Sequence, residues 1–438
     1  MSRFPRVFRP FVAILLVVGA LCAQSVPNAD PSETAAREVL GLPTATEIET
    51  VMRGLSEITG FKIHRRLPFE MVTREQVNQF LKDQIRKSVK TKELRAEEAT
   101  LRMFGFVPKD FDLKQTTIDL LTEQAAAYYD FQRRKLFISD WATRNMREVA
   151  LVHELAHALA DQNFPIRRYL AAAGDDSEAS IARQSVVEGQ ASWLMLEYAA
   201  RQSGRSLKDP GTAAEFLKEQ PDPGPDDPGD AQYPVFSKAP LYVRRTLMFP
   251  YEEGQKLQQS LYLKEGQASF SHVFRQPPAA TTQILHPDRY LDHFLTSSPE
   301  LPKAASGTSA LVSGAVGELD HRIILRQFLD QAISESLAPL LKGGTYRIDE
   351  AKSDHRLTLA YISEWQSEDA ARRYFDAYKK VLRAKLKGIT IARDTDSAFS
   401  GGSDDGYFGV TLSGVRVLSR EGLAKPLQAA QLSGATGF

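Results

Sequence analysis

Two histidines separated by three residues, with a glutamate directly after the first, form the segment of this chain best suited to chemistry. The segment reads Val152-His153-Glu154-Leu155-Ala156-His157. Residues four apart lie on one face of a helix, so His153 and His157 can direct two imidazole nitrogens at one ion. Two imidazoles suit tetrahedral zinc, and Glu154 can act as general base toward a water molecule activated by that ion.

The helix that must carry this pattern is predicted from about Asp140 to Asp161. Most positions around the two histidines are Ala, Leu and Val, as in a helix buried within a catalytic domain. Asp140 is a suitable N-cap, and the helix can end before Pro165. Asp161 follows His157 by four residues, and we interpret it as an anchor for the helix end or as a partner of a ligand.

A third metal ligand is expected from a second helix, predicted over 177–201. A catalytic zinc takes three protein ligands and keeps one position for water. Glu188 would complete a His-His-Glu set that holds one Zn²⁺ per chain. Gly189 lowers helix stability, and close approach of this helix to the zinc helix would explain it. Competing third ligands in the sequence are Asp161, Glu178 and Glu197.

The first 24 residues are interpreted as a signal peptide. Arg3, Arg6 and Arg9 precede an apolar run from Phe11 to Ala23, which is short for a membrane span. Cys22 is the only cysteine, and the residue before it, Leu21, is too large for a lipoprotein signal. The mature chain would therefore have no disulfide, which favours a periplasmic or secreted bacterial protein without stable membrane insertion.

Composition excludes some partners and leaves others open. The 438 residues include 55 basic and 55 acidic side chains, a balance that gives no reason to expect nucleic acid as a partner. A hydrophobic content of 42% is ordinary for a globular protein. The expected partner is a peptide or protein substrate, and the oligomeric state is left open.

The remaining pattern predicts an α+β fold that is predominantly helical. We expect an N-terminal α+β lobe (25–140), a helical zinc-binding region (141–300) and a small α+β C-terminal unit (301–438). Within the first lobe, the expected elements are a helix over 35–58 interrupted near 41–43, strands at 61–63, 69–72, 126–131 and 135–138, and a capping box over 73–76. The hairpin just before the zinc helix could bind an extended peptide by strand addition.

The C-terminal part carries weaker signals. A Pro/Asp/Gly stretch (221–229) cannot hold a helix. A helix is expected again over 241–263. An irregular stretch (296–314) is a better candidate for a domain boundary than 221–229. The elements expected after it are a helix over 318–341, a strand over 356–362, a helix over 367–386, and strands over 389–392 and 409–418.

Taken together, several segments resemble an exported bacterial family of zinc metallopeptidases with the gluzincin type of site. These segments are 51–55, 128–130, 153–162, 187–191, 249–254, 277–278 and 283–290. The resemblance implies a zincin core with a small sheet, an active-site helix and a helical second lobe that supplies Glu188. One position departs from the gluzincin pattern. Ser192 stands where many gluzincins have an acidic residue that orients a zinc-bound histidine.

The expected function is hydrolysis of peptide bonds by an exported zinc metallopeptidase, with Glu154 as general base. The oxyanion formed in this reaction needs a donor besides zinc. We expect His286 or Tyr290 in this role, with Arg289 and Tyr251 as further candidates. Two alternatives stay open: an envelope binding or scaffold protein on a zincin fold without catalysis, and a zinc amidase that acts on cell-wall material.

Overall fold

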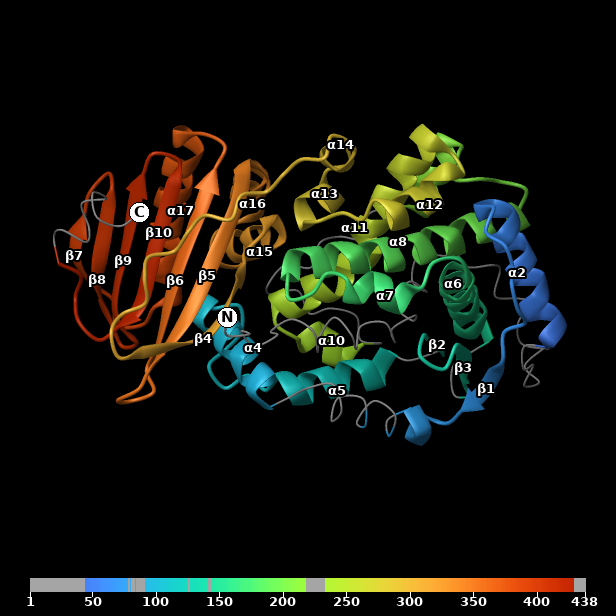
Figure 1. Cartoon of the computed structure of the whole chain (residues 1–438), viewed down its shortest axis with the longest axis horizontal. Helices are drawn as coiled ribbons and strands as arrows, with labels where there is room; N and C mark the ends of the chain where they lie inside the picture. The colour runs from blue at the N-terminus through green and yellow to red at the C-terminus, as the bar shows by residue number, and fades with distance from the viewer. Residues whose placement is uncertain are drawn as a thin grey trace.

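The computed structural model describes residues 44–77, 79, 83, 91–124, 127–140, 144–217 and 233–428. Within them the fold is mixed α and β, with a helical half around the histidine pair and a second half built on a large sheet (Figure 1). The expected signal peptide and the 221–229 stretch lie outside the described residues. None of the described helices has the length and hydropathy needed to cross a membrane.

The helical half contains a three-stranded sheet in the order β1-β3-β2. Its strands are β1 (Phe69–Val72), β2 (Ala127–Asp130) and β3 (Lys135–Ser139), which confirms three of the four strands expected here. β1 runs parallel to β3, and β2 forms the antiparallel edge. The strand expected at 61–63 is wrong. Side chains of Gln162 and Asn163 bind the backbone of this segment instead, at Lys62 and His64.

Two helices of this half begin with a capping box, of which only the second was predicted from the sequence. Helix α2 (Ala45–Thr59) begins after a capping box between Thr44 and Glu47 and ends at Gly60 with φ 73°. The described part of the helix expected over 35–58 is α2, and 35–43 lies outside the described residues. At the second start, Thr73 and Gln76 exchange reciprocal hydrogen bonds between side chain and backbone, which confirms the capping box.

Three long helices form the body of the helical half: α6 (Arg144–Asn163), α8 (Ser177–Gln202) and α11 (Leu241–Glu265). The first two match the helices expected around the histidine pair and Glu188. Shorter helices surround them: α5 (Leu113–Gln124), α7 (Ile166–Ala171), α9 (Pro210–Phe216), α10 (Pro234–Lys238), α12 (Ala268–Arg275), α13 (Thr281–Leu285) and α14 (Pro287–Leu291).

Gly189 marks a close helix crossing with α11, whereas the sequence suggested a crossing with α6. A Cβ atom on Gly189 would lie 2.0 Å from the carbonyl carbon of Gly254. A Cβ atom on Gly254 would lie 2.0 Å from the backbone oxygen of Ser185. Two glycines therefore let α8 and α11 approach backbone to backbone, directly beside Glu188.

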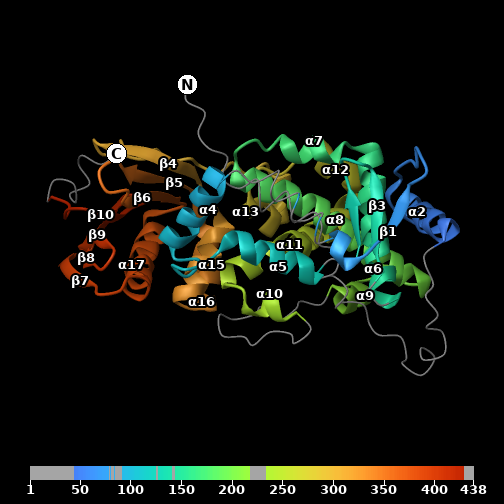
Figure 2. The same ribbon diagram turned by 90° about the horizontal axis from the view of Figure 1, so that it is seen from below.

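The second half is a seven-stranded antiparallel sheet in the order β4-β5-β6-β10-β9-β8-β7. Its strands are β4 (Thr308–Ala315), β5 (Leu341–Ala351), β6 (Leu357–Trp365), β7 (Thr390–Asp394), β8 (Ala398–Ser403), β9 (Gly406–Ser413) and β10 (Arg416–Leu423). Helix α17 (Glu368–Lys385) packs against the sheet and carries the phenol of Tyr374, which is 2.9 Å from that of Tyr361 in β6 (Figure 2).

The sequence underestimated this sheet. The stretch 296–314 was expected to be irregular throughout, but it contains most of β4. Strand β8 was not expected. The single strand expected over 409–418 spans parts of two strands, β9 and β10. The single helix expected over 318–341 is two helices, α15 (Glu318–Phe328) and α16 (Gln331–Leu337), followed by a 3-10 turn (Ala338–Leu340) and β5. The break occurs because Asp330 leaves the helical conformation and caps α16 through the backbone N–H of Ile333.

Helix α4 (Thr91–Phe104) precedes the histidine pair in the chain but packs on the C-terminal sheet. The ring of Phe104 meets those of Tyr346 and Tyr361 edge to face, at centroid distances of 5.4 and 5.5 Å. Arg95 binds both carboxylate oxygens of Glu350 in β5. The two halves therefore share one continuous apolar core.

Buried carboxylates join the two halves where α8, α13 and α15 meet. Glu178, in the first turn of α8, accepts hydrogen bonds from the backbone and hydroxyl of Thr281. Burial raises the pKa of Glu178 to about 8, with a further contribution from the charge of Asp320. Burial also raises the pKa of Asp320 to about 6. The neighbouring Glu318 differs, because His286 and Arg322 outweigh burial and hold its pKa below the ordinary value.

These shifts predict that replacing Glu178 with Gln stabilises the protein in alkaline solution. A carboxyl group whose pKa is raised by folding contributes stability at low pH and loses that contribution as the pH passes through its folded pKa. The free energy of unfolding of Glu178→Gln should match the native value at about pH 5 and exceed it by about 2 kcal/mol at about pH 8.5. Urea denaturation at both pH values measures this difference.

Glu318→Gln provides the contrast, because the pKa of Glu318 is lowered in the folded protein. Its contribution is present above the unfolded pKa, so this variant should be less stable than the native protein at both pH values. Equal pH dependence of the native protein and Glu178→Gln would contradict the prediction.

Candidate metal centre

Four buried side chains from two helices form the candidate site. His153, Glu154 and His157 come from α6, and Glu188 comes from α8, which packs against it. Each of the four residues is at most 2% exposed. Ionisable and imidazole groups are rarely buried without partners. This burial therefore indicates that the four side chains interact with one another or with a common ligand.

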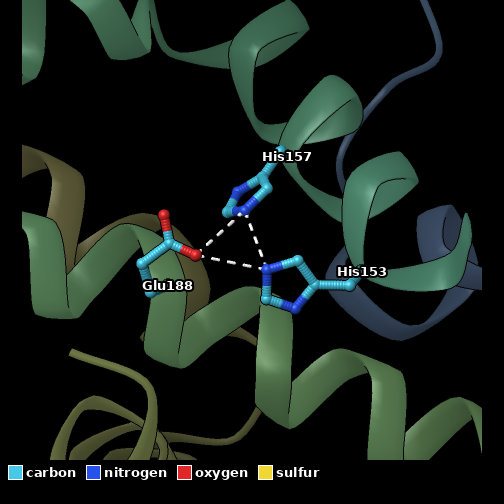
Figure 3. A group of neighbouring side chains, drawn as sticks. All are labelled: His153, His157 and Glu188. Atoms are coloured by element: carbon cyan, nitrogen blue, oxygen red, sulfur yellow. Dashed lines mark hydrogen bonds and ion pairs between the residues drawn. The ribbon is translucent and has the colours of Figure 1, made fainter. Parts of the chain in front are cut away.

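The three predicted ligand atoms lie at the corners of a nearly regular triangle (Figure 3). Nε2 of His153 is 3.0 Å from Nε2 of His157, and Oε2 of Glu188 is 3.2 Å from each of these nitrogens. Ligand atoms about 2.0–2.1 Å from a tetrahedral zinc ion are separated by about 3.3 Å. The triangle therefore has the size that such an ion requires, and two imidazoles with a carboxylate are donors that zinc accepts.

The electrostatics of the cluster favour a carboxylate between two imidazoles. Although burial acts to raise it, the pKa of Glu188 is lowered to about 2 by His157 and His153. Oε1 of Glu188 and Nδ1 of His153 are buried without a hydrogen-bond partner in the described part of the chain. The first leaves a second oxygen that could also bind a cation. The unpaired Nδ1 of His153 is consistent with Ser192, which stands where many gluzincins have an acidic residue that would bind such a nitrogen.

Glu154 is fixed beside this cluster by the edge strand β2. Its Oε2 accepts a hydrogen bond of 2.7 Å from the backbone N–H of Tyr129. Burial raises the pKa of Glu154 to about 8, while the charge of His153 and the bond from Tyr129 oppose the rise. A carboxylate whose pKa lies near neutrality is suited to accept and return a proton.

The other acidic residues considered as ligands have separate structural roles. Asp161 accepts hydrogen bonds from the phenol of Tyr129 and from the backbone of Ile166, so it anchors the end of α6 as the sequence suggested. Glu197 binds the backbone of Leu207 and fixes the turn after α8. Glu178 binds Thr281, as described above. The described part of the chain groups only Glu188 with the two histidines.

The two residues expected to stabilise the oxyanion make their contacts elsewhere. Nε2 of His286 is 2.9 Å from Oε1 of Glu318, and Tyr290 donates to the backbone oxygen of Gln276. Arg289 also binds Glu318. These partners indicate structural roles for both residues. A catalytic role for His286 or Tyr290 stays a prediction. Tyr251 of α11, the remaining candidate, stacks on His153 at a ring-centroid distance of 5.9 Å.

The hairpin before α6 was predicted from the sequence, but its contacts with the candidate site were not. The N–H of Tyr129 that holds Glu154 belongs to the backbone, which any residue carries. The ring of Phe131, just beyond β2, meets His157 edge to face at 5.8 Å. The sequence signal for these contacts is the group of aromatic residues Tyr128, Tyr129 and Phe131, which lies shortly before α6.

Comparison of the chain with family models, with curated proteins and with solved structures gave no match.

Proposed function

We propose that this protein is a zinc-dependent hydrolase that cleaves peptide bonds. The observation that carries the proposal is the triangle of His153, His157 and Glu188, with Glu154 held directly beside it. A site that only binds zinc for structural reasons needs no buried carboxylate next to the ligands. Glu154 is such a carboxylate, and it is one residue away from a ligand on the same helix.

Each residue of the cluster has a distinct role in this proposal. His153, His157 and Glu188 would hold the ion. Bound zinc would act as a Lewis acid that acidifies water and polarises a carbonyl oxygen. Glu154 would accept a proton from the attacking water and return it to the leaving amine. The N–H of Tyr129 would keep the Glu154 carboxylate oriented through both transfers.

The surroundings of the site support a peptide as substrate. We propose a zincin-like core made of the three-stranded sheet, α6 and the helical lobe with α8. In this core, β2 is an edge strand and lies against α6, where an extended chain could add to it. Because the cluster is at most 2% exposed, a substrate reaches Glu154 only after covering segments move, which makes opening a step of the proposed cycle.

Metal content tests the proposed ligands directly. The purified protein should contain about one zinc ion per chain. His157→Ala and Glu188→Ala should each bind zinc at least about 100-fold more weakly, since a lost ligand costs more than a lost supporting contact. Glu154→Gln should keep its zinc, because Glu154 is not a ligand. Elemental analysis and competition with a chromogenic chelator measure these values.

Glu178→Gln is a matched control, because it changes another buried carboxylate of α8 and should leave zinc content unchanged. Zinc retained by Glu188→Ala would show that the third ligand is misassigned. A native protein that binds no zinc when zinc is supplied would contradict the proposal and favour a binding or scaffold role.

A further inference from the structure

A large cavity lies away from the metal centre, at the junction of the two halves. Its volume is about 1250 Å³, which exceeds the roughly 300–1,000 Å³ of most small-molecule sites. Its wall combines the segment after α4, the start of α11, the ends of α15 and α17, and turns of the C-terminal sheet. Junctions between structural units are common places for ligand sites.

The wall is apolar within and basic as a whole. Phe106, Val107 and Leu241 are buried residues of the wall, and Phe328 and Leu386 add partly exposed apolar surface. The residues that line the cavity include seven basic and three acidic side chains, a net charge of +4, in a chain whose total charge is zero. The charge of this wall is therefore a local feature and not a property of the whole surface.

Ion pairs occupy four of the seven basic side chains of the wall, and two of these pairs, Arg102 with Glu98 and Arg356 with Asp354, use acids that lie outside it. Lys109 pairs with Asp405, and Lys385 pairs with Glu421, which neutralises two of the three acids. In the part of the chain that the structure describes, the ammonium groups of Lys238 and Lys387 make no hydrogen bond or ion pair. Both are exposed residues of the cavity wall, so they are free to meet an anionic group of a ligand.

From this arrangement we infer that the cavity binds an anionic amphiphile, a small molecule with an apolar chain and one carboxylate or phosphate group. The apolar chain would pack mainly on the partly exposed Phe328 and Leu386, where it leaves water. The anionic group would face Lys238 or Lys387. This site is independent of the metal centre, so neither inference depends on the other.

Calorimetric titration of the full protein with dodecyl phosphate, below its micelle concentration, tests the inference. We expect saturable binding at one site that weakens as the salt concentration rises. Dodecyltrimethylammonium, which has the same chain and the opposite charge, should bind at least about ten-fold more weakly. Inorganic phosphate, which lacks the chain, should give no measurable binding.

Three variants locate the site. Lys238→Glu combined with Lys387→Glu should weaken dodecyl phosphate binding by about ten-fold or more. Ala384→Trp, an exposed position of the cavity wall on α17, should weaken it by filling the space. Lys380→Glu reverses a charge on the same helix outside the cavity wall and should bind like the native protein. Unchanged thermal unfolding of each variant shows that the fold is intact.

Binding that is equally tight in the native protein and the double variant would overturn the inference, as would equal affinity for the cationic amphiphile. Zinc content, measured in the same samples, should be unchanged throughout.

Discussion

Replacing Glu154 with Gln should lower kcat for peptide hydrolysis by about 1,000-fold while KM and bound zinc stay close to their native values. The amide oxygen can still accept the hydrogen bond from the Tyr129 backbone, so the local structure is kept. The amide cannot take a proton from water, which removes the general base. Since burial raises the pKa of Glu154 to about 8, the neutral amide should also leave the folded state at least as stable near neutral pH.

The measurement is cleavage of a fluorogenic peptide selected by screening a peptide library with the native protein. Glu148→Gln is the matched control, because it makes the same chemical change at an exposed position of the same helix. This control should retain native kcat. Native activity in Glu154→Gln would contradict the proposed mechanism, even if the metal ligands are correct.

Replacing Gly189 with Ala should destabilise the protein by about 3 kcal/mol, in spite of the higher helix propensity of alanine. The new methyl group would meet backbone atoms of Gly254 and Gln255 at 2.0–2.5 Å, and backbone cannot rotate aside as a side chain can. Helices α8 and α11 would have to separate. Because Glu188 is the adjacent residue, zinc affinity should fall as well, by about ten-fold or more.

Urea denaturation and chelator competition measure the two effects. Gly211→Ala is a suitable control, since its methyl group would meet only a side-chain oxygen of Asp209 at 3.2 Å in an exposed helix. We expect that variant to be as stable as the native protein or slightly more stable. An equally stable Gly189→Ala would show that α8 and α11 can separate at little cost.

The sequence predicted that His153, His157 and Glu188 come together, and helical periodicity explains much of this success. His153 and His157 share a face as a consequence of their spacing, and Glu188 lies on a helix with clear apolar periodicity. α6 ends at Asn163, before Pro165 as expected, and Asp176 caps α8, although this cap was not predicted. These are local signals, and local signals can be read from sequence.

The missed features depend on contacts between distant segments. β5 contains Gly343 and Gly344, which are poor strand formers, and a Cβ atom on Gly343 would collide with the backbone of Ser297. That close approach explains why glycine occurs there, but position 297 gives no hint of it. Likewise, His286 and Tyr290 have residue types suited to oxyanion stabilisation, yet their partners, Glu318 and Gln276, are known only once the chain is folded.

The packing of α4 on the C-terminal sheet also has a consequence for biosynthesis. Arg95 and Glu350, which hold the two together, are separated by 255 residues. A ribosome that adds about 5–20 residues per second needs roughly 10–50 s to make that much chain. During this interval, the face of α4 that carries Phe104 has no sheet to cover it. Newly made chains are therefore most exposed to proteolysis and aggregation late in synthesis. A chain that ends before β5 cannot bury the apolar face of α4.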